Sequence, residues 1–165
     1  NWETYAEVPV KNIGFSGDTA TAMAERFEAD VLPFKPRLLV VMGGVNDFRG
    51  GTPAAVTIRA LAQIADKCRA YGITPVFVTA TPIHPRRMAT SFGVEPAAEN
   101  WQKNQRQIND WIMAQPHAVD VTAALTDEHG NLLGDYTADG LHPDHEAKRY
   151  IGEAIGRYIA AHLAF

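Results

Sequence analysis

Two short apolar runs with a helical segment between them restrict the folds that this chain can adopt. Leu38-Leu39-Val40-Val41-Met42 and Pro75-Val76-Phe77-Val78-Thr79 are almost continuously apolar, as in strands that are covered on both faces. The segment opened by Thr52-Pro53 and closed by Gly72 carries apolar residues at helical spacing, namely Ile58, Leu61, Ile64, Ala65 and Cys68. A strand, a helix and a second strand in this order predict a parallel pair in an α/β fold.

The rest of the chain also alternates between predicted strands and predicted helices. The sequence predicts short strands at residues 8–13 and 118–121, and helices at 19–32, 99–115 and 143–163. Residues 43–51 and 128–131 are expected as turns. Residues 81–98, which include His84 and Phe92, are too long for a simple connection and are expected as a binding loop or lid.

Length and composition limit the function classes. The 165 residues are expected to form a single domain over residues 1–165, because 46% of them are hydrophobic. Fifteen basic and nineteen acidic residues give a net charge of −4 without a single-sign block, which excludes an electrostatic footprint for nucleic acid or a membrane surface. We therefore expect a small-molecule partner. Because no apolar run approaches the roughly 20 residues of a membrane span, we expect no such span. Cys68, the single cysteine, is expected in the core; the compartment and the oligomeric state stay open.

Asp139-Gly140-Leu141-His142-Pro143 places a carboxylate and an imidazole three residues apart. Gly140 allows a sharp turn, and Pro143 fits the first turn of the following helix. An ionised Asp139 that accepts the Nδ1–H of His142 would leave Nε2 free to take a proton from a hydroxyl nucleophile. The alternative is that Asp139 caps the helix and that His142 is a surface histidine.

Two further turns offer donors for an oxyanion. Gly17 lies in a turn that leads into a helix, where backbone N–H groups are free, and Asn46 offers a side-chain amide on a glycine-rich turn. An ordinary turn glycine, and a helix cap at Asn46 or Asp47, are the alternatives. Because active sites form beyond the carboxyl ends of parallel strands, we expect all three turns to meet at one edge.

Three segments together resemble the second, third and fifth sequence blocks of the SGNH (GDSL-type) esterases and lipases. They are the string from Asn12 to Thr19, Gly44-Val45-Asn46-Asp47 and the Asp139–Pro143 turn. The resemblance implies a flavodoxin-like three-layer α/β/α sandwich with a mostly parallel sheet, and a Ser-His-Asp ester hydrolase without a metal or other cofactor. By position it assigns the oxyanion hole to Gly17 and Asn46, the general base to His142 and its orientation to Asp139.

The family's first block, a Gly-Asp-Ser turn that carries the nucleophile, has no counterpart among these residues. We expect that serine, and the strand before it, on a segment preceding Asn1, since the missing strand would otherwise leave two strand edges unpaired. A rival nucleophile is Ser16, because Gly14-Phe15-Ser16-Gly17-Asp18 falls one glycine short of a nucleophile elbow.

Two other readings remain open. The chain could be a catalytically inactive binding module, or Asp139, His142 and His145 could hold a divalent metal ion for hydrolysis. For an esterase acting through an acyl-enzyme, the predicted topology places three residues at the rim where they would contact the substrate: Phe48, Ile83 and Leu141.

Overall fold

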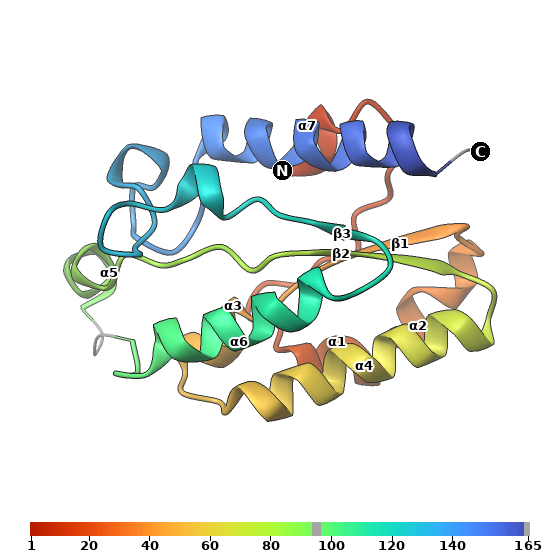
Figure 1. Cartoon of the computed structure of the whole chain (residues 1–165), viewed down its shortest axis with the longest axis horizontal. Helices are drawn as coiled ribbons and strands as arrows, with labels where there is room; N and C mark the ends of the chain where they lie inside the picture. Colours follow the sequence, from red (N-terminus) through yellow and green to blue (C-terminus); the bar gives the residue numbers. More distant parts are fainter. Residues whose placement is uncertain (94–96, 164–165) are drawn as a thin grey trace. The chain divides into compact units, whose positions relative to one another are not determined.

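Strands β1 (Leu38–Met42) and β2 (Thr74–Val78) run parallel, as the two apolar runs predict. Their register pairs Leu38 with Thr74 and Met42 with Val78. The short strand β3 (Ala118–Val119) completes a sheet with the order β1-β2-β3 (Figure 1). The predicted parallel pair is confirmed, and β3 is shorter than the predicted strand at 118–121.

The computed structural model describes residues 1–93 and 97–163, so residues 94–96 of the predicted lid loop lie outside the described part. The chain divides into two compact units, each assembled from separated stretches. The first unit contains Asn1–Asn12, Thr81–Pro96 and Val119–Phe165. The second unit contains Ile13–Ala80 and Ala97–Ala118.

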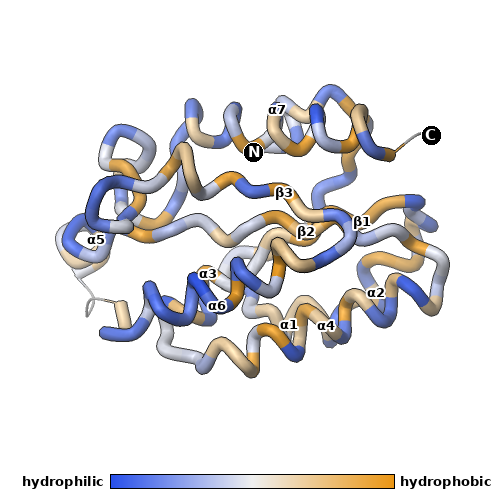
Figure 2. Tube along the Cα trace, in the orientation of Figure 1, coloured by the Kyte–Doolittle hydropathy of each residue, from blue (hydrophilic) through white to orange (hydrophobic). Residues whose placement is uncertain are grey.

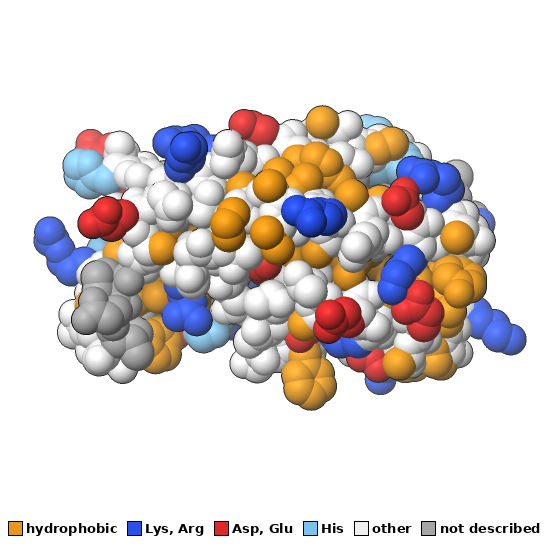
Figure 3. Space-filling view, turned by 90° about the horizontal axis from the view of Figure 1, so that it is seen from below, with side chains coloured by type: hydrophobic (Ala, Val, Ile, Leu, Met, Phe, Trp, Pro, Cys, Tyr) orange, Lys and Arg blue, Asp and Glu red, His pale blue; other side chains and the backbone are white. Residues whose placement is uncertain are grey.

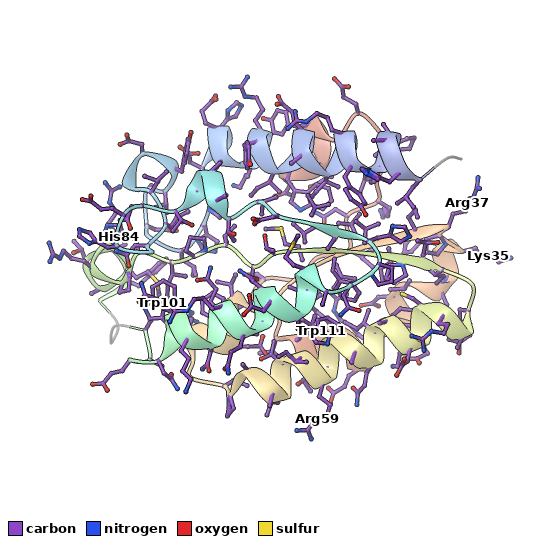
Figure 4. The ribbon with its side chains drawn as sticks, viewed as in Figure 1. Lys35, Arg37, Arg59, His84, Trp101 and Trp111 are labelled. Carbon is purple, nitrogen blue, oxygen red and sulfur yellow. The ribbon has the colours of Figure 1, made fainter. Side chains whose placement is uncertain are left out.

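The second unit holds β1, β2 and the helices that cover them. These helices are α1 (Ala20–Glu25), α2 (Phe27–Asp30), the 3-10 turn η2 (Leu32–Phe34), α3 (Val45–Arg49), α4 (Ala54–Ala70) and α6 (Trp101–Met113). Helix α4 packs against β2, α1 and α6. Cys68 on α4 is fully buried, as predicted, and burial raises the pKa of its thiol to about 11. Trp111 on α6 meets Phe77 of β2 edge to face, with ring centroids 5.3 Å apart (Figure 4).

The first unit is organised around α7 (His145–His162). It also contains α5 (Pro85–Phe92) and the 3-10 turns η1 (Trp2–Tyr5), η3 (Ala123–Leu125) and η4 (Gly134–Tyr136). The predicted apolar stripe of α7 is buried at Ala147, Ile151, Ile155 and Ile159. In Figure 2 both α7 and α4 alternate between hydrophobic and hydrophilic residues, as expected for helices that bury one face. Gly152 and Gly156 let the backbone of η1 approach α7, because a Cβ at either position would collide with a backbone oxygen of Trp2 or Ala6.

Several predicted elements differ from the structure. Residues 8–13 form no strand; among the described residues the sheet consists of β1, β2 and β3. The predicted helix at 19–32 breaks at Arg26, whose ψ of 3° departs from helical geometry. The predicted turn at 43–51 contains α3, and the predicted lid loop at 81–98 contains α5. Local propensity alone could not show that these two short helices would be stabilised by packing.

Candidate active site

Asp139 and His142 form a close pair in the first unit. The Nδ1 atom of His142 lies 2.7 Å from Oδ2 of Asp139. The other carboxylate oxygen, Oδ1, accepts the backbone N–H groups of Leu141 and His142, both at 2.8 Å. The side chain of Asp139 is 28% exposed and that of His142 is 63% exposed. The carboxylate is therefore held by hydrogen bonds on both of its oxygens, while the imidazole stays open to solvent.

The ionisation of Asp139 fixes the tautomer of His142. Burial by itself raises the pKa of the Asp139 carboxyl, but the hydrogen bonds from the His142 amide, the His142 ring and the Leu141 amide outweigh it and lower the pKa to about 2. At neutral pH the carboxylate is ionised and can only accept hydrogen bonds, so Nδ1 of His142 carries the proton. The nitrogen left to exchange a proton is Nε2, as a general base requires.

The turn that carries this pair is held against the start of α5. Gly140 has a φ of +85°, and its carbonyl accepts the N–H of His84 at 2.7 Å. The guanidinium of Arg87 donates to the carbonyl of Thr137 at 2.7 Å, and the Thr137 hydroxyl accepts the N–H of Gly140 at 2.9 Å. The turn that carries Asp139 and His142 is thus held by hydrogen bonds to residues at the start of α5 as well as by hydrogen bonds within the turn.

Helix α7 begins later than predicted. Pro143 lies before the helix, and Asp144 is its N-cap, since the Asp144 side chain accepts the N–H of Ala147 at 2.9 Å. Asp139 therefore does not cap α7, which removes the alternative explanation for its position in the sequence. Its carboxylate instead forms hydrogen bonds with two backbone N–H groups of the turn and with the imidazole.

Gly17 and Asn46 lie close together in the second unit. Asn46 on α3 donates its side-chain N–H to the carbonyl of Asp18 at 2.8 Å, one residue after Gly17. Gly17 has a φ of +83°, is exposed, and has nothing within 4 Å of where a Cβ would stand. The amide of Asn46 has a second N–H, and Gly17 has a backbone N–H on an exposed turn. These are the two kinds of donor that an oxyanion hole uses.

Asp47 positions this second pair, a role that the sequence did not reveal. Its carboxylate is buried, with Oδ2 accepting the N–H of Ala20 at 3.0 Å and Oδ1 accepting the Thr57 hydroxyl at 3.2 Å. Ala20 is the first residue of α1, so Asp47 joins α3 to the end of the Gly17 turn. A carboxylate directly after Asn46 in a glycine-rich segment was the only signal of this role.

The predicted substrate contacts need correction at two positions. Phe48 is fully buried and stacks on Trp101, which is labelled in Figure 4, with ring centroids 5.9 Å apart, because α3 packs against α6. Ile83 is also fully buried, and its carbonyl accepts the N–H of Leu132 at 3.1 Å. Neither side chain presents a surface to a substrate. Leu141 is half-buried, and its contact with substrate stays a prediction.

The cluster considered for a metal ion is engaged in other contacts. Nε2 of His145 lies 2.8 Å from the Tyr5 hydroxyl, and Nδ1 lies 3.3 Å from a carboxylate oxygen of Glu146. Within residues 1–93 and 97–163, no three His, Cys, Asp or Glu side chains are grouped so that they could hold a metal ion. Asp139 and His142 pair with each other, while His145 pairs with η1.

The structure therefore brings the four candidate residues together as two pairs. Asp139 and His142 belong to the first unit, and Gly17 and Asn46 belong to the second. That the two pairs face one another across a substrate stays a prediction.

In the part of the chain that the structure describes, no helix has the length and apolar character needed to cross a membrane. Acidic and basic side chains are interspersed on the face shown in Figure 3.

Comparison with solved structures defines the fold as flavodoxin-like α/β with a parallel sheet. A GDSL-like lipase from Bacteroides thetaiotaomicron VPI-5482 is 24% identical with a TM-score of 0.74, over 90% of this chain and 74% of that chain. An acetylxylan esterase from Geobacillus stearothermophilus is 20% identical with a TM-score of 0.68, over 90% of this chain and 70% of that chain. A variant of that esterase with one serine replaced by alanine is described as a catalytic mutant.

The sequence comparisons identify the family. The model of the GDSL-like lipase/acylhydrolase family matches residues 2–150, and the chain belongs to this family. A curated relative, the uncharacterized lipoprotein YqeF of Bacillus subtilis (strain 168), is 28% identical over 116 residues, which are 60% of this chain and 48% of that protein. The chain thus spans about half the length of that relative. The SGNH (GDSL-type) resemblance seen in the sequence is confirmed.

Proposed function

We propose that this protein hydrolyses a small carboxylic ester through an acyl-enzyme, with His142 as general base and then general acid. The observation that carries the proposal is the 2.7 Å contact between His142 Nδ1 and an Asp139 carboxylate that two backbone N–H groups also hold. The protein's membership of a lipase/acylhydrolase family supports the same reaction class. The acetylxylan esterase of similar fold supports an ester as the substrate.

The proposed reaction has two halves. A serine hydroxyl attacks the ester carbonyl carbon while Nε2 of His142 takes its proton, and the resulting oxyanion accepts hydrogen bonds from the Gly17 N–H and the Asn46 amide. The bond to the alcohol oxygen then breaks, and His142 returns the proton to the departing alcohol. Water attacks the acyl-enzyme in the same manner, which releases the carboxylic acid and restores the serine.

The nucleophile is proposed to be a serine outside these 165 residues. Ser16 and Ser91 are the two serines of this sequence. Ser16 lies beside Gly17 in the segment assigned to the family's second block, which supplies an oxyanion donor rather than the nucleophile. The serine replaced in the catalytic mutant of the similar esterase supports a serine mechanism.

Covalent labelling of the full-length natural protein tests the proposal. A fluorophosphonate should react with one serine, and peptide mapping should place that serine outside residues 1–165. A Ser16→Ala variant should keep both labelling and hydrolysis of a short-chain aryl ester, and a chelator should not change the rate. Labelling of Ser16 would make it the nucleophile. Absence of both labelling and hydrolysis would favour a binding module, and loss of activity with a chelator would favour the metal-dependent reaction.

A further inference from the structure

Phe92 presents an apolar ring beside the candidate catalytic imidazole. It is the last residue of α5 and is 45% exposed. Its ring lies edge to face with that of His142, with centroids 6.4 Å apart and an interplanar angle of 71°. We propose that Phe92 forms one wall of the subsite for the alcohol part of the ester and favours alcohols with an apolar carbon skeleton. This inference rests on the proposed function.

The position of Phe92 is set by a rigid element. Met88, one helical turn earlier on α5, is fully buried and lies on the same side of the helix. The hydrogen bond between His84, which is labelled in Figure 4, and Gly140 joins the start of α5 to the turn that carries His142. Helix α5 and the imidazole therefore keep a fixed relation, and the ring of Phe92 is preorganised before a substrate arrives.

The chemistry of His142 decides which part of the ester lies near Phe92. Nδ1 is occupied by Asp139, so Nε2 must pass its proton to the oxygen of the departing alcohol. Proton transfer requires that oxygen to lie within hydrogen-bond reach of the imidazole, at about 3 Å. A side chain that flanks the imidazole is therefore placed beside the alcohol.

An exposed aromatic ring at this position has a physical consequence for specificity. A half-exposed ring gains from contact with an apolar surface, because that contact removes apolar area from water. Ethanol offers little such surface, whereas a benzyl alcohol offers a flat apolar face. The preference should appear in the first half of the reaction only, since the alcohol has left before water attacks the acyl-enzyme.

The test compares Phe92→Ala, Phe92→Leu and the unchanged full-length protein on matched esters. Benzyl acetate and ethyl acetate share the acyl group and have alcohols of similar acidity, while benzyl butyrate changes the acyl group alone. Phe34→Ala is the matched control, because Phe34 is a phenylalanine of similar exposure, 54%, in the other unit. The pH profile of kcat/KM is recorded for each variant.

We expect Phe92→Ala to lower the ratio of kcat/KM for benzyl acetate over ethyl acetate by about 5- to 10-fold, mainly through KM. Phe92→Leu should restore part of that ratio, and Phe34→Ala should leave it unchanged. The ratio of kcat/KM for benzyl acetate over benzyl butyrate should not change, and neither should the pH profile of kcat/KM. An equal loss of kcat/KM for all esters, together with a displaced pH profile, would show that Phe92 only positions His142 and would overturn the inference. An altered preference between acyl groups would also overturn it. If the unchanged protein hydrolyses no ester, the proposed function itself fails.

Discussion

Gly140 and His84 are joined so closely that Gly140 has no room for a side chain. The N–H of His84 donates to the carbonyl of Gly140 at 2.7 Å, and a Cβ on Gly140 would stand 2.5 Å from the carbonyl oxygen of His84. The Asp139–His142 pair sits on the same turn. The geometry of the candidate catalytic pair therefore depends on a glycine that takes no part in the chemistry.

Replacing Gly140 by alanine should cost both stability and activity. The φ of +85° strains any L side chain, and the new Cβ would press on backbone atoms that cannot move away. We expect Gly140→Ala to lower the free energy of unfolding by about 3 kcal/mol or more, measured by urea denaturation. Gly72→Ala is the control, because Gly72 has a φ of +68° but open space around it, and should lose about 1 to 2 kcal/mol. Equal losses would show that the close approach to His84 is unimportant.

His142→Ala should abolish ester hydrolysis of the full-length protein and leave the melting temperature nearly unchanged. The side chain is 63% exposed, so its removal leaves little buried surface unfilled. Loss of a general base should lower kcat by at least about 10³-fold. His129→Ala, at a histidine that is 75% exposed, should leave both quantities unchanged. A large fall in melting temperature for His142→Ala would mean that the residue is structural.

Asn46→Ala should lower kcat by about 10²- to 10³-fold with a small change in KM, if its amide stabilises the oxyanion. The lost hydrogen bond to Asp18 is part-buried, so the unfolding free energy should also fall, by about 1 kcal/mol. Steady-state kinetics and thermal denaturation of the same sample separate the two effects. A kcat within threefold of the unchanged protein would remove Asn46 from the oxyanion hole.

Asp139 should make stability depend on acid pH. Its pKa is lowered from 3.8 to about 2 in the folded protein, so between these values the unfolded chain binds more protons than the folded one. The stabilisation by the carboxylate is therefore complete above about pH 4 and is lost as the pH falls towards 2. The difference in melting temperature between the unchanged protein and Asp139→Asn should be constant from pH 7 to 5 and shrink below pH 4. A difference that grows as the pH falls would contradict the assignment.

Strands β1 and β2 were predictable because their apolar runs need cover on both faces wherever they lie. The helices α4, α6 and α7 were predictable because their apolar residues recur at a spacing that makes one face to bury. The strand expected at 8–13 was wrong because a strand depends on a partner that local sequence does not supply. The short helices α3 and α5 were missed because packing, rather than propensity, stabilises segments of this length.

The features of the candidate site also fall into those that the sequence indicated and those that it did not. The sequence alone indicated Asp139, His142, Gly17 and Asn46, since a carboxylate three residues before an imidazole and a glycine turn before a helix are local patterns. Burial of Phe48 and exposure of Phe92 could not be read locally because they depend on which way a short helix faces, and burial of Ile83 depends on the packing of the segment before α5.

The sequence by itself determined the α/β pattern, the family and the turn in which Asp139 can reach His142, because each is carried by short motifs whose residues are neighbours in the chain. Only the tertiary structure decided that Asn46 binds the carbonyl of Asp18, that Asp47 holds the first amide of α1, and that α5 places Phe92 against the imidazole. These contacts join residues far apart in the chain, and their geometry is set by how helices pack rather than by the sequence on either side of them.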